Sequence, residues 1–205
     1  MKEFIAIIIF AVMLLSLTVC ASAVTGETAP ASNVLVAFFS RTGENYGVGV
    51  IKKGNTHIIA DIIAGKMGAY TFEIARVTPY PEAYRECTDE AKNEKNANAR
   101  PELTAAVDNF SAYDVVFLGY PNWWGDMPMP VYTFLESYDF SGKTVIPFCT
   151  HAGSGLSGTE STIAGMLSGA TVLDGLAVAG TTAQNDYDAA EKAVTEWLEK
   201  LALEK

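Results

Sequence analysis

An alternation of short apolar runs with longer amphipathic stretches most constrains how this chain can fold. The runs are rich in β-branched and aromatic residues and nearly continuous in apolar ones, as strands covered on both faces require. They occupy residues 34–39, 70–76, 114–120, 143–150 and 171–178. The other stretches fit helices at residues 56–67, 81–99, 130–138, 158–167 and 187–203. This alternation predicts an α/β fold, a doubly wound parallel sheet of five strands with helices on both faces. We expect Asn55 to cap the first helix and Gly68 to end it.

The first 23 residues form a separate segment. Residues 4–19 carry no charge, and Ala21-Ser22-Ala23 then gives the small-x-small pattern that signal peptidase recognises. An apolar run this short falls below the ~20 residues that span a bilayer core, and it fits a cleaved secretory signal. A retained N-terminal anchor and lipid attachment at Cys20 are the alternatives. We therefore expect an exported protein with a signal peptide at 1–23, a short leader at 24–32 and one domain at 33–205.

Charge and cysteine content narrow the function classes. The chain carries 14 Lys and Arg against 24 Asp and Glu, a net charge of −10. A chain this acidic repels the phosphate backbone of nucleic acids, and we therefore expect no nucleic-acid binding. The same acidity favours a basic partner. After the signal segment two cysteines remain, Cys87 on a predicted helix and Cys149 at a predicted strand end. We expect free thiols rather than a disulfide, and no His, Asp or Glu cluster in the sequence indicates a metal site.

In an open parallel sheet, ligands bind beyond the carboxyl ends of the strands. The first such segment is Ser40-Arg41-Thr42-Gly43, and after eleven further residues Asn55-Thr56 opens a helix. Hydroxyl groups, a glycine and a helix N-terminus present several donors to a phosphate. The spacing matches neither a dinucleotide fingerprint nor a P-loop. On spacing alone, the pattern is consistent with a phosphate site or with a polar turn beside a capped helix.

A second segment, after residues 114–120, begins with Pro121-Asn122-Trp123-Trp124-Gly125. Adjacent tryptophans in an extended loop point in different directions, so they are not expected to be ordinary core residues. They suit a flat apolar ligand edged with polar groups. The alternative is a packed loop that covers the end of the sheet.

A third segment, after residues 143–150, contains His151-Ala152-Gly153-Ser154-Gly155. Its glycines allow a ligand to approach the backbone and its N–H donors. A serine-hydrolase elbow is excluded, because Ala152 and Leu156 stand where that motif has glycine. His151 is a candidate proton donor or a loop residue with no ligand.

Together, the three segments resemble the flavodoxin family. The shared motifs are FSRTGENY at 39–46, GNT at 54–56, YPNWWGDMP at 120–128 and FCTHAGSG at 148–155. The resemblance covers residues 33–203 and implies a flavodoxin-like fold with non-covalently bound FMN. It also implies the strand order 2-1-3-4-5, for which flavodoxin itself is a standard example of FMN at the switch point.

The resemblance further implies residue roles. The FMN phosphate would be held by Ser40, Thr42, Asn55 and Thr56, with Gly43 in the same loop. The isoalloxazine ring would be bordered by Pro121, Asn122, Trp123, Trp124 and Gly125 and by Thr150, His151, Gly153, Ser154 and Gly155. One departure is that residues 44–54 split a phosphate loop that is continuous in the family. The insertion brings Tyr46, Lys52 and Lys53 beside the site, to enclose FMN or to meet a partner.

The resemblance favours an FMN-dependent electron-transfer protein that works outside the cytoplasm with a redox partner, a basic one in view of the chain's acidity. The alternative is an NAD(P)H-dependent FMN reductase of quinones or flavins on the same fold. The sequence has no nicotinamide signature, and NAD(P)H is scarce outside the cytoplasm. A third function is a non-redox binding module. We expect membrane contact only through a retained anchor or a lipid.

Overall fold

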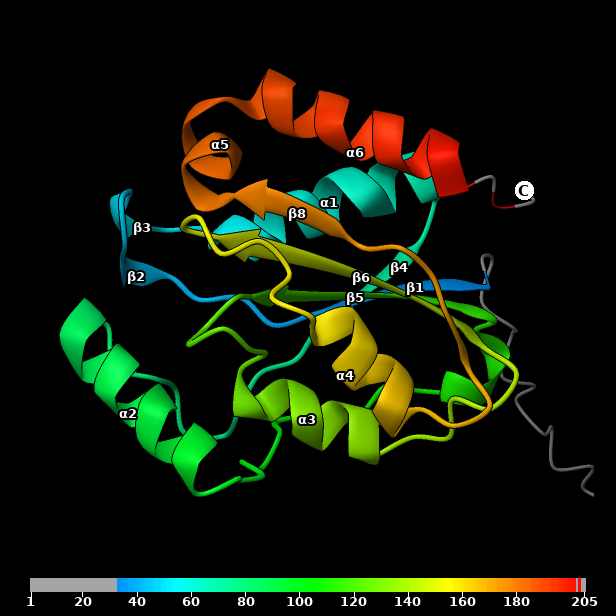
Figure 1. The fold of residues 1–205 in the computed structure, drawn as a ribbon, viewed down its shortest axis with the longest axis horizontal. Helices are drawn as coiled ribbons and strands as arrows, with labels where there is room; N and C mark the ends of the chain where they lie inside the picture. Colours follow the sequence, from blue (N-terminus) through cyan, green and yellow to red (C-terminus); the bar gives the residue numbers. More distant parts are fainter. Residues whose placement is uncertain (1–32, 202, 204–205) are drawn as a thin grey trace, which may run out of the picture.

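The computed structural model describes residues 33–201 and 203, and a parallel β-sheet lies at its centre (Figure 1). The sheet contains β1 (Val34–Phe38), β4 (Tyr70–Glu73), β5 (Val115–Pro121), β6 (Thr144–His151), β7 (Thr171–Val172) and β8 (Leu176–Ala179). The order is β4-β1-β5-β6-β7, all neighbours are parallel, and β8 also pairs with β6. The predicted doubly wound α/β fold and its order 2-1-3-4-5 are confirmed, with the fifth position shared by β7 and β8.

Helices cover both faces of the sheet (Figure 1). One face carries α1 (Asn55–Met67), α5 (Gly180–Asn185) and α6 (Tyr187–Leu201), and the other carries α3 (Met129–Glu136) and α4 (Thr159–Met166). In β1, Val34, Val36 and Phe38 pack into the core beneath α1 and α6. Leu35 and Ala37 pack into the core beneath α3 and α4. A continuous apolar strand therefore contributes to one core on each face of the sheet.

Two elements lie outside these layers. Part of the inserted segment 44–54 forms an antiparallel hairpin of β2 (Gly43–Asn45) and β3 (Gly49–Ile51). Helix α2 (Tyr84–Asn96) lies near this hairpin and α3 rather than over the sheet (Figure 1). Its buried residues are Cys87 and Ala91, and most of its other side chains are polar or charged. A short 3-10 helix, η1 (Phe110–Ala112), precedes β5.

The fifth strand differs from its prediction over residues 171–178, because the chain leaves the sheet after β7 and returns at β8. Between them, Gly175 N donates to Glu160 Oε1 at 2.6 Å, and Asp174 O accepts a hydrogen bond from Trp197 Nε1 at 3.0 Å. Side chains from α4 and α6 thus bind the backbone that a continuous strand would need. The second predicted strand is also shorter, since β4 ends at Glu73.

The predicted C-terminal end of α1 agrees with the structure, and the predicted N-terminal cap does not. Gly68 ends the helix with a φ of 60°, as expected. The prediction of Asn55 as the N-cap is wrong, because Gly54 occupies the N-cap and Asn55 is the first helical residue. Instead, Ser40 Oγ accepts a hydrogen bond from His57 N at 3.1 Å. The capping hydroxyl therefore comes from the loop after β1, on the far side of the insertion.

The predicted signal peptide, its anchor and lipid alternatives, and the leader lie outside the described residues. Within residues 33–201 and 203, no helix is long and apolar enough to cross a membrane. Cys87 and Cys149 are both buried and unpaired with each other. Burial raises the pKa of the Cys87 thiol to about 11 and that of Cys149 to about 12.

Candidate functional site

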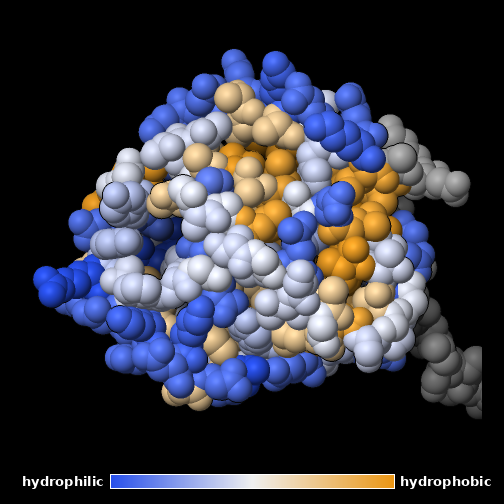
Figure 2. Space-filling model, in the orientation of Figure 1, coloured by the Kyte–Doolittle hydropathy of each residue, from blue (hydrophilic) through white to orange (hydrophobic). Residues whose placement is uncertain are grey.

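The loops after β1, β5 and β6 meet at the carboxyl edge of the sheet, where the winding reverses between β1 and β5. A cavity of about 460 Å³ opens there, within the ~300–1,000 Å³ typical of small-molecule sites. Figure 2 shows the surface hollowed on the side of the β2–β3 hairpin. The cavity is lined by eight of the predicted residues: Asn55, Pro121, Asn122, Trp123, Trp124, Thr150, His151 and Gly153.

The start of α1 makes part of the cavity polar. Asn55 lines the cavity, and its Oδ1 is buried without a hydrogen-bond partner. Gly180 packs so closely against this side chain that a Cβ at position 180 would lie 2.4 Å from Asn55 Nδ2. The first amides of a helix have no partner within the helix and carry partial positive charge. Asn55 therefore places a polar side chain at the start of α1 in the wall of the larger cavity.

The loop after β5 makes another part of the cavity aromatic. The Trp123 ring makes edge contacts with Phe39 and Tyr80, at centroid distances of 5.4 and 5.1 Å. The Trp124 side chain is 50% exposed, and its Nε1 donates to Thr88 O at 3.0 Å. The two adjacent rings thus have different neighbours, and both line the cavity.

Hydrogen bonds join the loops after β5 and β6. Asn122 N donates to Thr150 O at 2.8 Å, and Asn122 Nδ2 donates to Gly155 O at 2.7 Å. Cys149 Sγ also donates to Gly155 O, at 3.3 Å. Gly155 and Ser154 are not among the residues that line the cavity, and Gly155 instead ties the two loops together.

His151 lies at the end of β6 and is uncharged at neutral pH. Its Nδ1 accepts a hydrogen bond from Gly153 N at 2.9 Å, which requires that this ring nitrogen carry no proton. Burial lowers the pKa of His151 below its ordinary value of 6.5. The imidazole proton therefore resides on Nε2, and Nδ1 holds the loop.

Thr56, predicted to hold a phosphate, is buried beside the cavity. Its hydroxyl lies 2.8 Å from the hydroxyl of Thr150, and the two form a buried hydrogen bond. This contact joins the first turn of α1 to the end of β6. Thr150 lines the larger cavity, whereas Thr56 does not.

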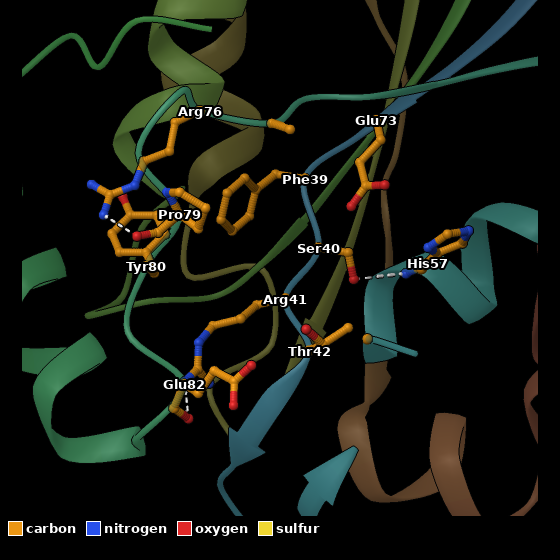
Figure 3. Close-up of a pocket in the computed structure, with 12 residues that line it drawn as sticks. Phe39, Ser40, Arg41, Thr42, His57, Glu73, Arg76, Pro79, Tyr80 and Glu82 are labelled. Atoms are coloured by element: carbon orange, nitrogen blue, oxygen red, sulfur yellow. Dashed lines mark hydrogen bonds between the residues drawn. The ribbon is translucent and has the colours of Figure 1, made fainter. Parts of the chain in front are cut away.

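Ser40 and Thr42 line a second cavity, of about 250 Å³, on the β4 side of the loop after β1. In Figure 3, Phe39 projects toward this space, and Ser40 lies next to His57. The Arg41 guanidinium donates to the carbonyls of Pro81 and Glu82 at 2.6 Å each. The structure thus separates the predicted phosphate residues, because Ser40 and Thr42 line the smaller cavity and Asn55 lines the larger.

Besides Gly155, the predicted glycines Gly43 and Gly125 line neither cavity and have backbone roles. Gly43 has a φ of +77°, and a Cβ there would lie 2.9 Å from Glu82 O. Gly125 has a φ of +72° in the same turn as Trp124. Both positions use a conformation that glycine adopts without a steric penalty.

Several residues line the larger cavity without having been predicted to bind the cofactor, among them Asn45 and Gly47 of the β2–β3 hairpin and Ala152 after β6. Two larger groups are Tyr84, Thr88 and Ala91 of α2, and Ala179, Gly180 and Thr181 at the junction of β8 and α5. The α2 residues belong to a charged stretch whose position depends on tertiary packing. The second group directly follows the fifth predicted strand, residues 171–178, so the rule that singled out the other loops would have found it if it had been applied to that strand as well.

The insertion contributes Asn45, Tyr46 and Gly47 to the larger cavity, and of these the sequence analysis had named Tyr46. Lys52 and Lys53 do not line it, and Lys53 forms an ion pair with Asp61. Among the residues that the structure describes, no group of three His, Cys, Asp or Glu is placed to hold a metal ion.

A doubly wound parallel sheet of this strand order, with a cavity at its switch point, defines a flavodoxin-like α/β fold. The family model described as Flavodoxin matches residues 33–201. The chain belongs to the flavodoxin family.

Solved structures agree with this assignment. The chain is similar to a candidate flavoprotein from Bacteroides eggerthii DSM 20697, with 29% identity, a TM-score of 0.68, and coverage of 84% of this chain and 99% of that one. A candidate flavoprotein from Bacteroides uniformis ATCC 8492 shows 27% identity, a TM-score of 0.66, and coverage of 82% and 98%. A flavoprotein in complex with FMN from Lactobacillus acidophilus NCFM shares the fold at 20% identity, with a TM-score of 0.58 and coverage of 72% and 93%. The comparison with curated proteins yields no match.

Proposed function

We propose that the protein is an FMN-binding electron-transfer protein of flavodoxin type that acts outside the cytoplasm. The observation that carries the proposal is the larger cavity, which combines the start of α1 with the two tryptophans after β5. Membership of the flavodoxin family supports it. The Lactobacillus flavoprotein of the same fold is a complex with FMN, which also supports this choice of cofactor.

The residues around the larger cavity fit FMN. Asn55 Oδ1 is a buried acceptor without a partner in the protein, and a ligand hydroxyl would satisfy it. The amides at the start of α1 suit a phosphate, and Trp123 and Trp124 offer flat apolar surface to a ring. FMN would supply the redox chemistry, while the chain binds it, orients it and excludes water. The assignment of Ser40 and Thr42 to the phosphate stays a prediction, because they line the neighbouring cavity.

Absorbance spectroscopy tests the cofactor. Protein mixed with FMN and then passed through a desalting column should retain the absorbance bands of bound flavin. Trp123→Ala and Trp124→Ala should reduce that retention, since both rings line the cavity. Thr42→Ala should weaken FMN more than riboflavin if Thr42 acts on the phosphate. Wild-type protein that retains no flavin would contradict the proposal and would leave a non-redox binding module.

Location is tested at the N-terminus of the mature protein. Cleavage of the proposed signal after Ala23 predicts a mature chain that begins at Val24 and is found outside the cytoplasm. A chain that begins at a lipid-modified Cys20 would indicate the lipid alternative, and an intact chain in the membrane fraction would indicate a retained anchor. An intact chain in the cytoplasmic fraction would contradict export.

Exposed aromatic rings at the cavity favour a second candidate, the NAD(P)H-dependent FMN reductase of quinones or flavins. Tyr46, Tyr84 and Trp124 line the cavity, yet they are 66%, 38% and 50% exposed. Such rings suit a second flat ligand. Steady oxidation of NADH or NADPH by FMN-loaded protein with a quinone would identify the reductase. Reduction and reoxidation by protein partners without that turnover would identify the carrier.

A further inference from the structure

The loop after β5 contains a turn with an unusual backbone. Trp123 N donates to Asp126 O at 2.9 Å and Asp126 N donates to Trp123 O at 3.1 Å, so Trp124 and Gly125 are the central residues of a two-residue turn. Their φ angles of +56° and +72° are those of a type I′ turn. The first central position usually holds Asn, Asp or Gly, because a left-handed backbone is costly for a residue with a bulky side chain. Here it holds a tryptophan that lines the cavity.

Helix α2 binds this turn at several points. Lys95 Nζ donates to Trp124 O at 2.9 Å and lies 3.1 Å from Asp126 Oδ2. Trp124 Nε1 donates to Thr88 O at 3.0 Å, and Lys92 Nζ lies 4.8 Å from the centroid of the Trp124 ring. One helix therefore contacts the backbone, the ring and the neighbouring carboxylate of the turn.

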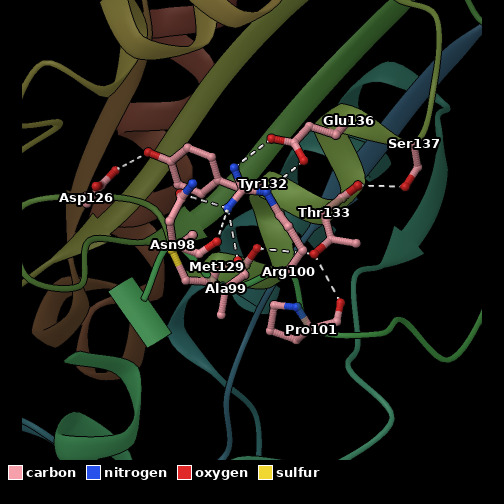
Figure 4. Close-up of polar contacts among 10 residues, drawn as sticks. All are labelled: Asn98, Ala99, Arg100, Pro101, Asp126, Met129, Tyr132, Thr133, Glu136 and Ser137. Atoms are coloured by element: carbon pink, nitrogen blue, oxygen red, sulfur yellow. Dashed lines mark hydrogen bonds and ion pairs between the residues drawn. The ribbon is translucent and has the colours of Figure 1, made fainter. Parts of the chain in front are cut away.

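Helix α3 binds the same turn from the other side. Asp126 Oδ1 accepts hydrogen bonds from Tyr132 Oη at 2.7 Å and from Met127 N at 2.8 Å. In Figure 4 the Tyr132 hydroxyl is directed at Asp126, and Arg100 binds Glu136 of the same helix. Burial, together with the hydrogen bond to Asp126, raises the pKa of Tyr132. The hydroxyl therefore keeps its proton and remains a donor to Asp126.

We propose that Lys95 and Asp126 are positioning residues that hold the Trp124 indole at the wall of the larger cavity. Backbone strain of this kind persists where the surrounding structure imposes it, and it concentrates at ligand sites. Without these two residues the turn would relax and the indole would leave the cavity wall. The identity of the ligand, a flavin ring, rests on the proposed function. The role of Lys95 and Asp126 in holding the turn is independent of the proposed function.

The first test uses the flavin-free protein. The indole Nε1–H signal of Trp124, assigned with Trp124→Phe, should exchange slowly with solvent because Thr88 O accepts its hydrogen bond. In Lys95→Met and in Asp126→Asn we expect the signal to shift and its exchange to be about 10-fold faster, as local opening becomes easier. Lys192→Met removes an exposed lysine of α6 and is the matched control, with an unchanged signal. An unchanged Trp124 signal in both test variants would overturn the inference.

The second test is an FMN titration of the same proteins. We expect the dissociation constant to rise about 10-fold in Lys95→Met and Asp126→Asn and to stay unchanged in Lys192→Met. Lys95→Arg keeps the charge and the donors and should retain most of the affinity. If wild-type protein binds FMN and both test variants bind it equally well, the inference fails while the proposed function stands. If wild-type protein binds no FMN, the proposed function fails, and the indole signal still decides whether the two residues hold the turn.

Discussion

Asn55 lines the larger cavity, and its side-chain amide fits there because residue 180 has no side chain. A Cβ at position 180 would meet Asn55 Nδ2 at 2.4 Å, so the amide lies where it does only beside a glycine. The φ of Gly180 is not left-handed, so its backbone does not itself require glycine. The need for glycine at this position is therefore set by the side chain of Asn55.

Gly180→Ala tests this pairing. The new methyl group would push aside the flexible end of Asn55, and alanine suits the helix backbone. We therefore expect the free energy of unfolding to change by less than about 1 kcal/mol while FMN affinity falls by about 10-fold. Gly65→Ala, inside α1 with open space around it, should raise the free energy of unfolding by about 0.5–1 kcal/mol and leave FMN affinity unchanged. Equal FMN affinity in Gly180→Ala and wild type would show that Asn55 does not contact the ligand.

His151 should make the protein less stable in acid. Burial lowers its pKa in the folded protein below the ordinary value of 6.5, so the unfolded chain binds the proton more readily. Well above pH 6.5, His151 is uncharged in both the folded and the unfolded protein and does not change the free energy of unfolding. As the pH drops below that value, the free energy of unfolding falls. Protonation would also turn Nδ1 into a donor and break its bond with Gly153 N.

Denaturant unfolding at about pH 7.5 and about pH 5.5 measures this effect. His151→Gln cannot titrate, so it should lose less stability than wild-type protein over that interval. The same substitution at His57 controls for the general loss of an imidazole. A loss in His151→Gln as large as in wild type would assign the acid sensitivity to other groups.

At the scale of elements, the hydroxyl pair of Thr56 and Thr150 joins α1 to β6 in a buried position. Either single substitution to valine leaves a buried hydroxyl without its partner, which costs about 1–3 kcal/mol, whereas removal of both can be nearly neutral. We expect Thr56→Val and Thr150→Val each to lower the free energy of unfolding in that range. The double variant should lose clearly less than the sum of the two, as measured by urea unfolding. Additive losses would mean that the two hydroxyls do not depend on each other.

The elements also show what the sequence could and could not predict. The continuous apolar run of β1 and the stop at Gly68 are local patterns, and both were predicted correctly. The cavity-lining tryptophans follow a strand and were found by that position. Local sequence patterns could not predict three features: the cap from Ser40, the break in the fifth strand at Gly175 and the placement of α2. Each depends on side chains distant in the chain, such as Glu160 on Gly175 and Lys95 on Trp124.

At the scale of the whole molecule, the net charge of −10 concerns association rather than folding. Many cations already have acidic partners within the protein. Examples are Lys66 with Glu191, Lys95 with Asp126 and Arg100 with Glu136. The acidic excess remains for interaction with other molecules, which supports the proposal of a basic redox partner.

Ionic strength tests that proposal on FMN-loaded, reduced protein. Electron transfer to a cationic metal complex should slow by about 10-fold between low and high salt, because screening removes the attraction. An anionic complex of similar potential is the control, and its rate should rise under the same conditions. Rates that are insensitive to salt for both acceptors would count against electrostatic docking.

The break between β7 and β8 bears on how the protein behaves at high concentration. One edge of the sheet is the four-residue β4, and the other is divided between the two-residue β7 and the four-residue β8. The longest sheet strands, β5 and β6, lie inside with neighbours on both sides. Aggregation through strand addition needs a long unpaired edge as a template. A sheet with edges this short should resist ordered self-association even when the protein is concentrated.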